Sequence, residues 1–364
     1  MIRLLRALID TAALRHNLGT IRAYAPGAKV MAVIKANAYG HGLVSTALAL
    51  ADADSFAVAR LEEGIALRSA GVRAPIVLLE GVFSAEQMAE AARHRFELVV
   101  HDPLQIKLLE GHRDARRFVV WIKMDTGMNR LGFRPEAFAP ALARLRNLTV
   151  PALELRAMTH LARADELDES MTGTQVDVFE KTLAAADLVG PKRLPTSIGN
   201  SAGTLGWPGA HGDWVRPGLA LYGVSPFGGE LAAKYGLSPV MTLETTVLTV
   251  REVKRGETVG YAGAWRAERD SAVAILAAGY GDGLSRQLAG GTPVLIAGEK
   301  YPLVGRVSMD MIAVDVTGAS GITAGSKAII WGEGLPVEEI AAHAGTIPYE
   351  LLCGVSQRVP LELK

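Results

Sequence analysis

A lysine stands at the end of a strongly apolar segment. The stretch "VMAVIKANAYGHG", residues 30–42, runs through apolar residues to Lys35 and then turns to small and polar ones. Lysine side chains are nearly always solvated, so a strand end reaching water is the simplest interpretation. An amine at this place can also serve as a base or condense with an aldehyde cofactor. Which interpretation holds depends on whether other reactive side chains gather at the same place.

Polar residues of chemically useful types follow other apolar segments in the same way. Arg130 lies in "KMDTGMNRLGF", His160 in "MTHLA", Asn200 and Ser201 in "SIGNSAG", and Arg216 in "RPGLA". A strand-end histidine by itself is more often a hydrogen-bonded structural residue than a catalytic one. Together with Lys35, these residues stand at the ends of five different strands, which indicates one shared site.

The segments that end on these residues have the pattern of a (β/α)8 barrel. Short runs rich in β-forming apolar residues alternate with helix-like stretches, of which one opens with Ser84 as N-cap and Gln87 three residues on. In such a barrel the active site lies at the carboxyl ends of the strands. The runs span residues 30–36, 55–60, 75–81, 96–102, 117–125, 153–162, 194–200 and 213–218.

The character of the chain changes after the Gly/Pro-rich stretch "YGVSPFGGELAAKYGLSP", residues 222–239. Beyond it, Val, Thr and Ile are dense, Gly-bearing turns are frequent, and long helical periods are scarce, a pattern typical of an antiparallel β domain. We therefore expect an α/β protein with an N-terminal barrel over residues 1–230 and a mostly β domain over residues 231–364.

Composition excludes several kinds of partner. Lys+Arg and Asp+Glu both number 38 among 364 residues, so no net field favours nucleic acid or an anionic membrane. The single cysteine, Cys353, excludes an intrachain disulfide and fits a reducing compartment. No signal-peptide core and no long apolar run is present, so we expect a soluble cytoplasmic protein with no metal site.

Two loops indicate an anionic cofactor. The loops after the seventh and eighth strands, which commonly hold phosphate in this architecture, read "GNSAGT" and "RPGLA". Their small residues let backbone N–H groups approach an anion closely. A lysine facing a phosphate site indicates pyridoxal 5′-phosphate. "GYGDG", residues 279–283, is a poor dinucleotide signal because no βαβ unit surrounds it.

Motifs along nearly the whole chain resemble those of the bacterial alanine racemase family. The resemblance implies a barrel that binds pyridoxal 5′-phosphate, a following β domain, a head-to-tail homodimer with shared active sites, and the small-molecule substrates L-alanine and D-alanine. These motifs, in family order, are "AVIKANAYGHG", "KMDTGMNRLGF", "MTHLA", "GNSAG", "RPGLALYG", "GYAGAW", "GYGDG" and "GRVSMDM".

The resemblance also implies two bases on opposite faces of the substrate. Lys35 matches the lysine that binds the cofactor and serves as base on the D-alanine side, and Tyr261 matches the tyrosine of the partner subunit that serves the L-alanine side. A free tyrosine has a pKa of about 10, so the phenolate needs stabilisation, which the family supplies through residues matching His160 and Arg216.

Arg216 also matches the donor to the pyridine nitrogen. A guanidinium keeps its proton there, so the ring is a weaker electron sink and proton return is favoured over transamination.

Other positions take roles through the same resemblance. Tyr39 and Ser201, with the backbone N–H groups of Gly218 and Leu219, match phosphate contacts, Asn200 a cofactor neighbour, Arg130 a substrate-carboxylate contact, Met309 a substrate contact from the partner, Tyr280 an entryway residue, and Lys123 a lysine that is often carbamylated. Gln357, in "CGVSQRVP", stands where some members have a phosphate-binding tyrosine, so we expect phosphate binding to rely more on Tyr39 and Ser201.

Three functions other than alanine racemisation are alternative interpretations of this sequence. A non-catalytic carrier of the cofactor shares the barrel and the lysine but lacks a β domain with partner-facing residues. A decarboxylase of the same two-domain kind is expected to place a carboxylate at the position of Arg216. A broader-specificity or serine racemase is closest, although the periplasmic kind carries a signal peptide and paired cysteines. Either a biosynthetic role, supplying D-alanine for peptidoglycan, or a catabolic role is compatible with the sequence.

Overall fold

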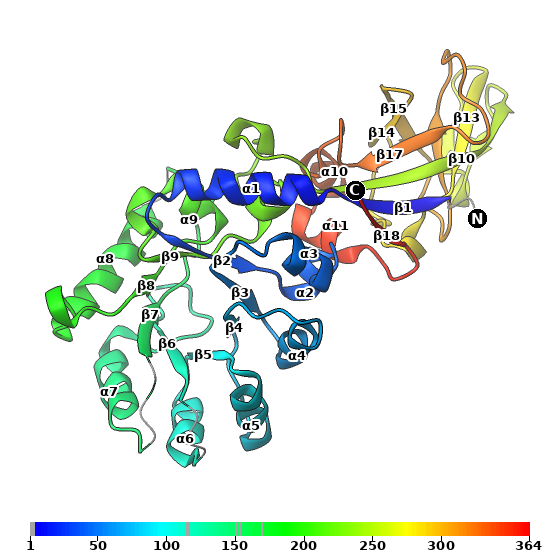
Figure 1. Cartoon of the computed structure of the whole chain (residues 1–364). Coiled ribbons are helices and arrows are strands. Elements are labelled where there is room, and N and C mark those ends of the chain that lie inside the picture. The colour runs from blue at the N-terminus through cyan, green and yellow to red at the C-terminus, as the bar shows by residue number, and fades with distance from the viewer. Residues whose placement is uncertain (1–3, 114–116, 150–151, 153, 169) are drawn as a thin grey trace.

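Eight short parallel strands form a closed barrel in the computed structural model, which describes residues 4–113, 117–149, 152, 154–168 and 170–364 (Figure 1). The ring closes where the N–H groups of Asp213 and Arg216 donate to the carbonyls of Thr196 and Gly199, at 2.9 and 2.8 Å. The predicted barrel is confirmed. Its strands are β2 (Lys29–Val33), β3 (Ser55–Val58), β4 (Ile76–Leu78), β5 (Glu97–Val100), β6 (Val119–Lys123), β7 (Glu154–Met158), β8 (Thr196–Ser197) and β9 (Trp214–Val215).

Helices surround the barrel and bury the outer face of its strands (Figure 1). Strands β3, β4 and β5 are buried at every position, which explains their continuous apolar sequence. Ser84 caps α5 as predicted, accepting from the Gln87 N–H at 3.2 Å, whereas the Gln87 side chain accepts from Phe83. The helices are α1 (Thr11–Tyr24), α3 (Leu43–Ala49), α4 (Leu61–Ser69), α5 (Ala85–His94), α6 (Pro103–Gly111), α7 (Pro135–Arg146), α8 (Ser170–Ala185) and α9 (Ser201–Gly206), with short turns η1 (Gly190–Lys192), η2 (Pro208–Ala210), η3 (Leu219–Tyr222) and η4 (Ala232–Tyr235).

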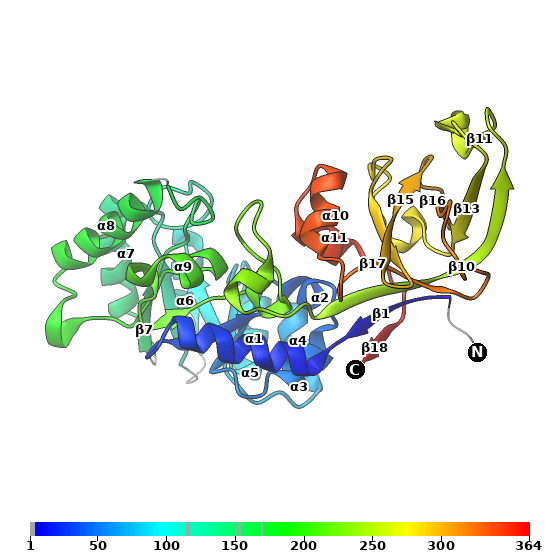
Figure 2. The same ribbon diagram turned by 90° about the horizontal axis from the view of Figure 1, so that it is seen from above.

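A second, mostly antiparallel sheet lies at one end of the molecule, as predicted (Figure 2). Its strand order is β13-β16-β15-β14-β17-β10-β1-β18, and β10 also pairs with β13. A register shift between Val247 and Thr249 lets this long strand change partners. The elements are β10 (Met241–Val253), β11 (Thr258–Val259), β12 (Trp265–Arg266), β13 (Ser271–Leu276), β14 (Pro293–Ile296), β15 (Glu299–Val304), β16 (Ile312–Asp315), β17 (Lys327–Trp331), β18 (Leu361–Leu363), η5 (Tyr261–Gly263), η6 (Tyr280–Asp282), α10 (Val337–Ala344) and α11 (Pro348–Gly354).

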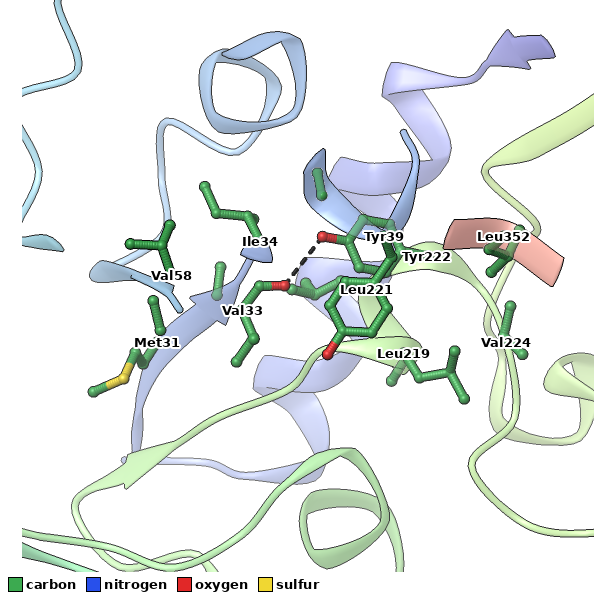
Figure 3. Packing of buried hydrophobic residues seen from close by; sticks show 14 of the residues in the cluster. Met31, Val33, Ile34, Tyr39, Val58, Leu219, Leu221, Tyr222, Val224 and Leu352 are labelled. Carbon is green, nitrogen blue, oxygen red and sulfur yellow. Dashed lines mark hydrogen bonds between the residues drawn. The ribbon is translucent and has the colours of Figure 1, made fainter. Parts of the chain in front are cut away.

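The two ends of the chain tie this sheet to the barrel. Strand β1 (Leu5–Ile9) pairs antiparallel with β10 and parallel with β18, although the predicted barrel region begins at residue 1. Helix α11 packs directly on the barrel: a Cβ at Gly40 would lie 2.1 Å from the carbonyl oxygen of Leu352, and Gly40 has φ +83°. Figure 3 shows Leu352 beside the rings of Tyr39 and Tyr222 in this contact.

The segment α2 (Lys35–Tyr39), directly after strand β2, is a left-handed turn. Ala36, Asn37, Ala38 and Tyr39 all have φ between 52° and 55°, and none of them is glycine. A left-handed conformation costs roughly 1–2 kcal/mol for each residue that carries a Cβ. The turn places Lys35 and Tyr39 at the carboxyl end of the barrel, so the surrounding structure must stabilise it.

Side-chain acceptors and donors hold the turn in place. Glu63 of α4 accepts the Ala36 N–H at 2.6 Å, and the Asn37 side chain accepts the Leu43 N–H at 2.9 Å. The Nδ1 atom of buried His41 lies 2.9 Å from the Tyr39 carbonyl oxygen. Burial lowers the pKa of His41 to about 4, so its ring is neutral and Nδ1–H donates.

We expect Glu63→Ala to destabilise the protein by roughly 1–2 kcal/mol, because it removes the acceptor of the Ala36 N–H in the turn and of the Ala59 and Arg60 N–H groups at the start of α4. The adjacent Glu62→Ala is the matched control, with an expected change within about 0.5 kcal/mol. Urea unfolding followed by circular dichroism measures both. Equal midpoints for the two variants would show that the carboxylate of Glu63 does not support the turn.

Candidate active site

A cavity of about 380 Å³ opens at the carboxyl ends of the barrel strands. The structure brings together in its wall every barrel residue that the sequence singled out for the site. These are Lys35, Tyr39, Lys123, Arg130, His160, Asn200, Ser201, Arg216, Gly218 and Leu219. The wall also contains residues that were not predicted, among them Glu80, Thr159 and Tyr349.

Positive charge accumulates in this cavity. Lys35, Lys123, Arg130 and Arg216 line it, with Glu80 as the acidic lining residue. Burial, followed by the charge of Arg130, lowers the pKa of Lys35. Burial, followed by the charges of Arg216 and Arg130, lowers the pKa of Lys123 to about 8. A cavity with this surplus of positive charge suits an anionic ligand.

Arg216 is buried at the bottom of the site, with 4% of its surface exposed. Its Nη1 donates to the Ser197 hydroxyl at 2.6 Å, and its Nη2 donates to the carbonyl oxygens of Thr159 at 2.6 Å and Ile198 at 3.0 Å. Burial lowers the pKa of Arg216 to about 10, which still leaves the guanidinium charged at neutral pH. These bonds fix the direction of its planar fork.

His160 stands next to this guanidinium as a neutral ring. Its Nδ1 lies 3.2 Å from Arg216 Nη2. Burial, and then the charge of Arg216, holds the pKa of His160 well below its usual range. Because an arginine can only donate, Nδ1 is the acceptor and the proton of the ring is on Nε2. Arg216 therefore fixes both the protonation and the orientation of His160.

Another part of the wall has the geometry of a phosphate cradle. The Ser201 hydroxyl oxygen accepts the N–H groups of Gly218 at 2.9 Å and Ala220 at 3.2 Å, so its own proton can point elsewhere. A Cβ at Gly218 would lie 2.4 Å from the Tyr39 hydroxyl, so a side chain there would displace it. Burial raises the pKa of Tyr39, which keeps this phenol a donor. The Asn200 side chain is occupied as the cap of α9 through the Gly203 N–H.

Tyr349 of α11 is a site residue that the sequence did not indicate. Its ring centroid lies 5.7 Å from that of Tyr39, and burial raises its pKa to about 12. Gln357, which we assigned to the place of a phosphate-binding tyrosine, is exposed and does not line the cavity. The wall therefore contains a second tyrosine at another position, whereas the expected reliance of phosphate binding on Tyr39 and Ser201 stays a prediction. Only the packing of α11 against α2 reveals the position of Tyr349.

Three predicted site residues lie outside the cavity of their own chain. Tyr261, Tyr280 and Met309 are 68%, 40% and 52% exposed on the second domain. Tyr280 and Met309 share one surface, since the N–H groups of Tyr280 and Gly281 donate to Ser308 and Met309. Tyr261 follows β11, which Figure 2 shows at the far end of the molecule from the barrel.

The described ranges contain neither a metal-binding cluster nor a membrane-spanning helix. Residues 4–113, 117–149, 152, 154–168 and 170–364 hold no group of three or more His, Cys, Asp or Glu side chains able to bind a metal ion. Within the same ranges, none of the helices combines the length and the apolar character needed to cross a membrane.

Comparisons with known proteins cover almost the full chain. Residues 9–226 match the family model described as alanine racemase, N-terminal domain, and residues 240–363 match alanine racemase, C-terminal domain. The alanine racemase of Aeromonas hydrophila is 49% identical over 359 residues, 98% of each chain. That of Nitrosococcus oceani is 49% identical over 355 residues, again 98% of each. The solved biosynthetic alanine racemase of Pseudomonas aeruginosa has a TM-score of 0.94 at 42% identity, covering 100% of both chains.

Proposed function

The chain belongs to the alanine racemase family and is an enzyme that racemises alanine, and we propose that it works with two bases and pyridoxal 5′-phosphate. The observation that carries this proposal is the composition of the barrel cavity. An amine with a lowered pKa, a fixed arginine and a cradle of hydroxyl groups all face the same space. The homologues agree with the reaction, and the chemistry of the wall supports the cofactor.

The residues present fit pyridoxal 5′-phosphate. Ser201 and Tyr39, with the backbone of Gly218 and Leu219, would hold its phosphate, and Asn200 lies beside them. Lys35 would bind the aldehyde carbon, since burial favours its neutral, nucleophilic amine. When bound, the cofactor supplies an electron-withdrawing ring that acidifies the α-proton of the substrate. Arg130 would bind the substrate carboxylate with its fork.

Proton transfer then falls to two side chains. We assign the D-alanine side to Lys35, whose Nζ takes and returns the proton. The L-alanine side falls to the Oη of Tyr261, which lies outside the cavity of its own chain. We therefore propose a head-to-tail homodimer in which Tyr261 and Met309 complete the site of the other subunit and Tyr280 lines its entrance. The exposure of these three large side chains on one chain supports it.

We expect two inactive variants to restore each other's activity. Lys35→Ala and Tyr261→Phe should each lack racemase activity as homodimers. A heterodimer has one site with both defects and one site with neither, so a randomly reassorted mixture should regain about a quarter of wild-type activity. Circular dichroism of L-alanine and D-alanine solutions, with α-proton exchange in D2O, measures conversion. A mixture that has exchanged subunits but stays inactive would contradict the shared site.

Arg216 is expected to favour racemisation over transamination. A guanidinium does not release its proton to the pyridine nitrogen, so charge stays near the α-carbon, where a proton can return. The hydrogen bonds to Ser197, Thr159 and Ile198 leave the fork no freedom to turn away.

We therefore expect Arg216→Glu to raise the pyruvate formed per racemisation event by roughly tenfold or more. A carboxylate there would raise the pKa of the pyridine nitrogen, and each pKa unit corresponds to about 1.4 kcal/mol, or a factor of ten. Arg216→Lys is the matched control: it keeps the positive charge and loses the fork, so racemisation should fall without extra pyruvate. Lactate dehydrogenase coupled to NADH oxidation measures pyruvate. Unchanged pyruvate in Arg216→Glu would refute this role.

Lys123 is proposed to carry a carbamate. No hydrogen bond or ion pair of its side chain occurs within the described part of the chain, although it lies among Arg130, Arg216 and Lys35. With a pKa of about 8, its amine is about half neutral at pH 8, against well under 1% for a lysine titrating at 10.5. The neutral amine is the form that reacts with CO2, and the resulting anion would orient Arg130.

¹³C-bicarbonate should therefore give a carbamate NMR signal near pH 8 that disappears in Lys123→Ala. The signal should fall as the pH drops well below 8, because protonation removes the reactive amine. Lys181→Ala, an exposed lysine paired with Asp177, is the control and should keep the signal. An identical spectrum for Lys123→Ala, or electron density ending in an ammonium at Lys123, would refute the modification.

We also propose a biosynthetic role for the enzyme, in the cytoplasm. The Pseudomonas aeruginosa neighbour is named a biosynthetic enzyme, which supports a role in supplying D-alanine for peptidoglycan. Cys353 is a free thiol, which agrees with the reducing cytoplasm.

A further inference from the structure

Five arginines line a groove at the end of the barrel opposite the active-site cavity. The groove has a volume of about 790 Å³ and lies where strands β4, β5 and β6 begin. The arginines of this arginine groove are Arg68, Arg73, Arg93, Arg95 and Arg117, and Glu97 is the one acidic residue among the groove-lining residues that the structure describes. The whole chain has 38 basic and 38 acidic residues, so this accumulation of positive charge is local to the groove and is not a property of the overall composition.

The nearby carboxylates leave most of this charge unbalanced. The carboxylate of Glu97 already has partners: it accepts from the Trp121 indole at 2.8 Å and pairs with Arg156 at 3.2 Å. Glu90 of α5 lies 3.3 Å from Arg93. Arg73, Arg95 and Arg117 are exposed and form no ion pair with any residue in the described ranges.

The floor of the groove is rigid. Arg68 extends from α4 and donates to the carbonyl oxygens of His94 at 2.9 Å and of Val72 and Ala74 at 2.8 Å, which joins two loops at the base of the barrel. Its pKa is lowered by burial and then by the charges of Arg73 and Arg95, so these like charges lie close together.

Arg95 also has a backbone conformation that arginine seldom adopts. It ends helix α5 in the left-handed conformation, with φ 55° and ψ 50°, where glycine or asparagine is the usual residue. An arginine there is disfavoured by the backbone and repelled by its neighbours. Both costs would be offset by a ligand that needs a guanidinium at this place.

We propose that the arginine groove binds an oligophosphate. Guanidinium groups match phosphate oxygens in pairs, and several of them in one concave site can contact a chain of phosphates together. The two phenylalanine rings in the groove, Phe96 and Phe118, are only 2% and 4% exposed, and His94 stacks on Phe96, so the phenylalanines offer no surface on which a base could stack. Recognition therefore rests on the phosphate chain itself and is independent of the proposed reaction at the other end of the barrel.

The test is calorimetric titration of the cofactor-loaded enzyme with inorganic triphosphate and, separately, with ATP at physiological salt. We expect one site per chain and similar affinity for both ligands. Arg73→Ala combined with Arg95→Gly should weaken binding by roughly tenfold or more, since both substitutions remove charge-assisted hydrogen bonds to the phosphate chain. Glycine also suits the backbone at position 95, so folding is preserved.

The matched control is Arg146→Ala with Arg255→Ala, which removes two exposed arginines elsewhere and should leave the affinity unchanged. Racemase activity with alanine as substrate should be the same in the wild type, the groove variant and the control variant. Equal triphosphate affinity for the groove variant and the wild type would overturn the proposal. So would a tenfold preference for ATP, or binding of a short single-stranded RNA without binding of triphosphate.

Discussion

Four cationic side chains share one small cavity, and the chemistry of the site depends on that crowding. Lys35, Lys123, Arg130 and Arg216 line the same wall and repel each other, and burial of Lys123 and Arg216 reduces screening by water there. Burial, and after it this repulsion, lowers the pKa of both lysines and of His160, whose ring stays neutral. The same repulsion makes an anionic ligand strongly favourable. A nucleophilic amine and a phosphate site thus follow from a single electrostatic condition.

The backbone that turns Lys35 toward this cavity adopts an unfavourable left-handed conformation. Four left-handed residues after β2 turn Lys35 and Tyr39 toward the cavity, and Glu63, Asn37 and His41 stabilise the turn. Helix α11 of the second domain packs against it so tightly that residue 40 must be glycine. The second domain therefore helps to build the cavity of its own chain through Tyr349, in addition to its proposed contribution to a partner.

The two ends of the barrel use positive charge differently. At the carboxyl end Arg216 is buried and hydrogen-bonded, and burial together with the neighbouring cations lowers the pKa of Lys35 and Lys123, which suits reactivity. At the amino end most of the arginines are exposed, and Arg68 mainly joins loops. Solvated arginines keep their charge and their forks free, which suits reversible binding of an anion rather than chemistry.

The sequence by itself determined the fold class and the positions at which the barrel strands end. Continuous apolar strands and Gly/Pro boundaries have local causes, so eight strands and a following β domain could be predicted from pattern alone. Lys35, Arg130, His160 and Arg216 could be placed at one site because parallel strands bring their carboxyl ends together. The roles of these residues came from family resemblance.

Only the tertiary structure decided which other side chains complete the cavity. Ala36–Tyr39 contains no glycine, so nothing local signals a left-handed turn, and Glu63 acts from a different helix. Tyr349 is far from Tyr39 in sequence and reaches it only because α11 docks on α2. Lowered pKa values depend on burial and on neighbours brought together by folding. Such effects arise between segments distant in the chain, and for that reason sequence patterns do not contain them.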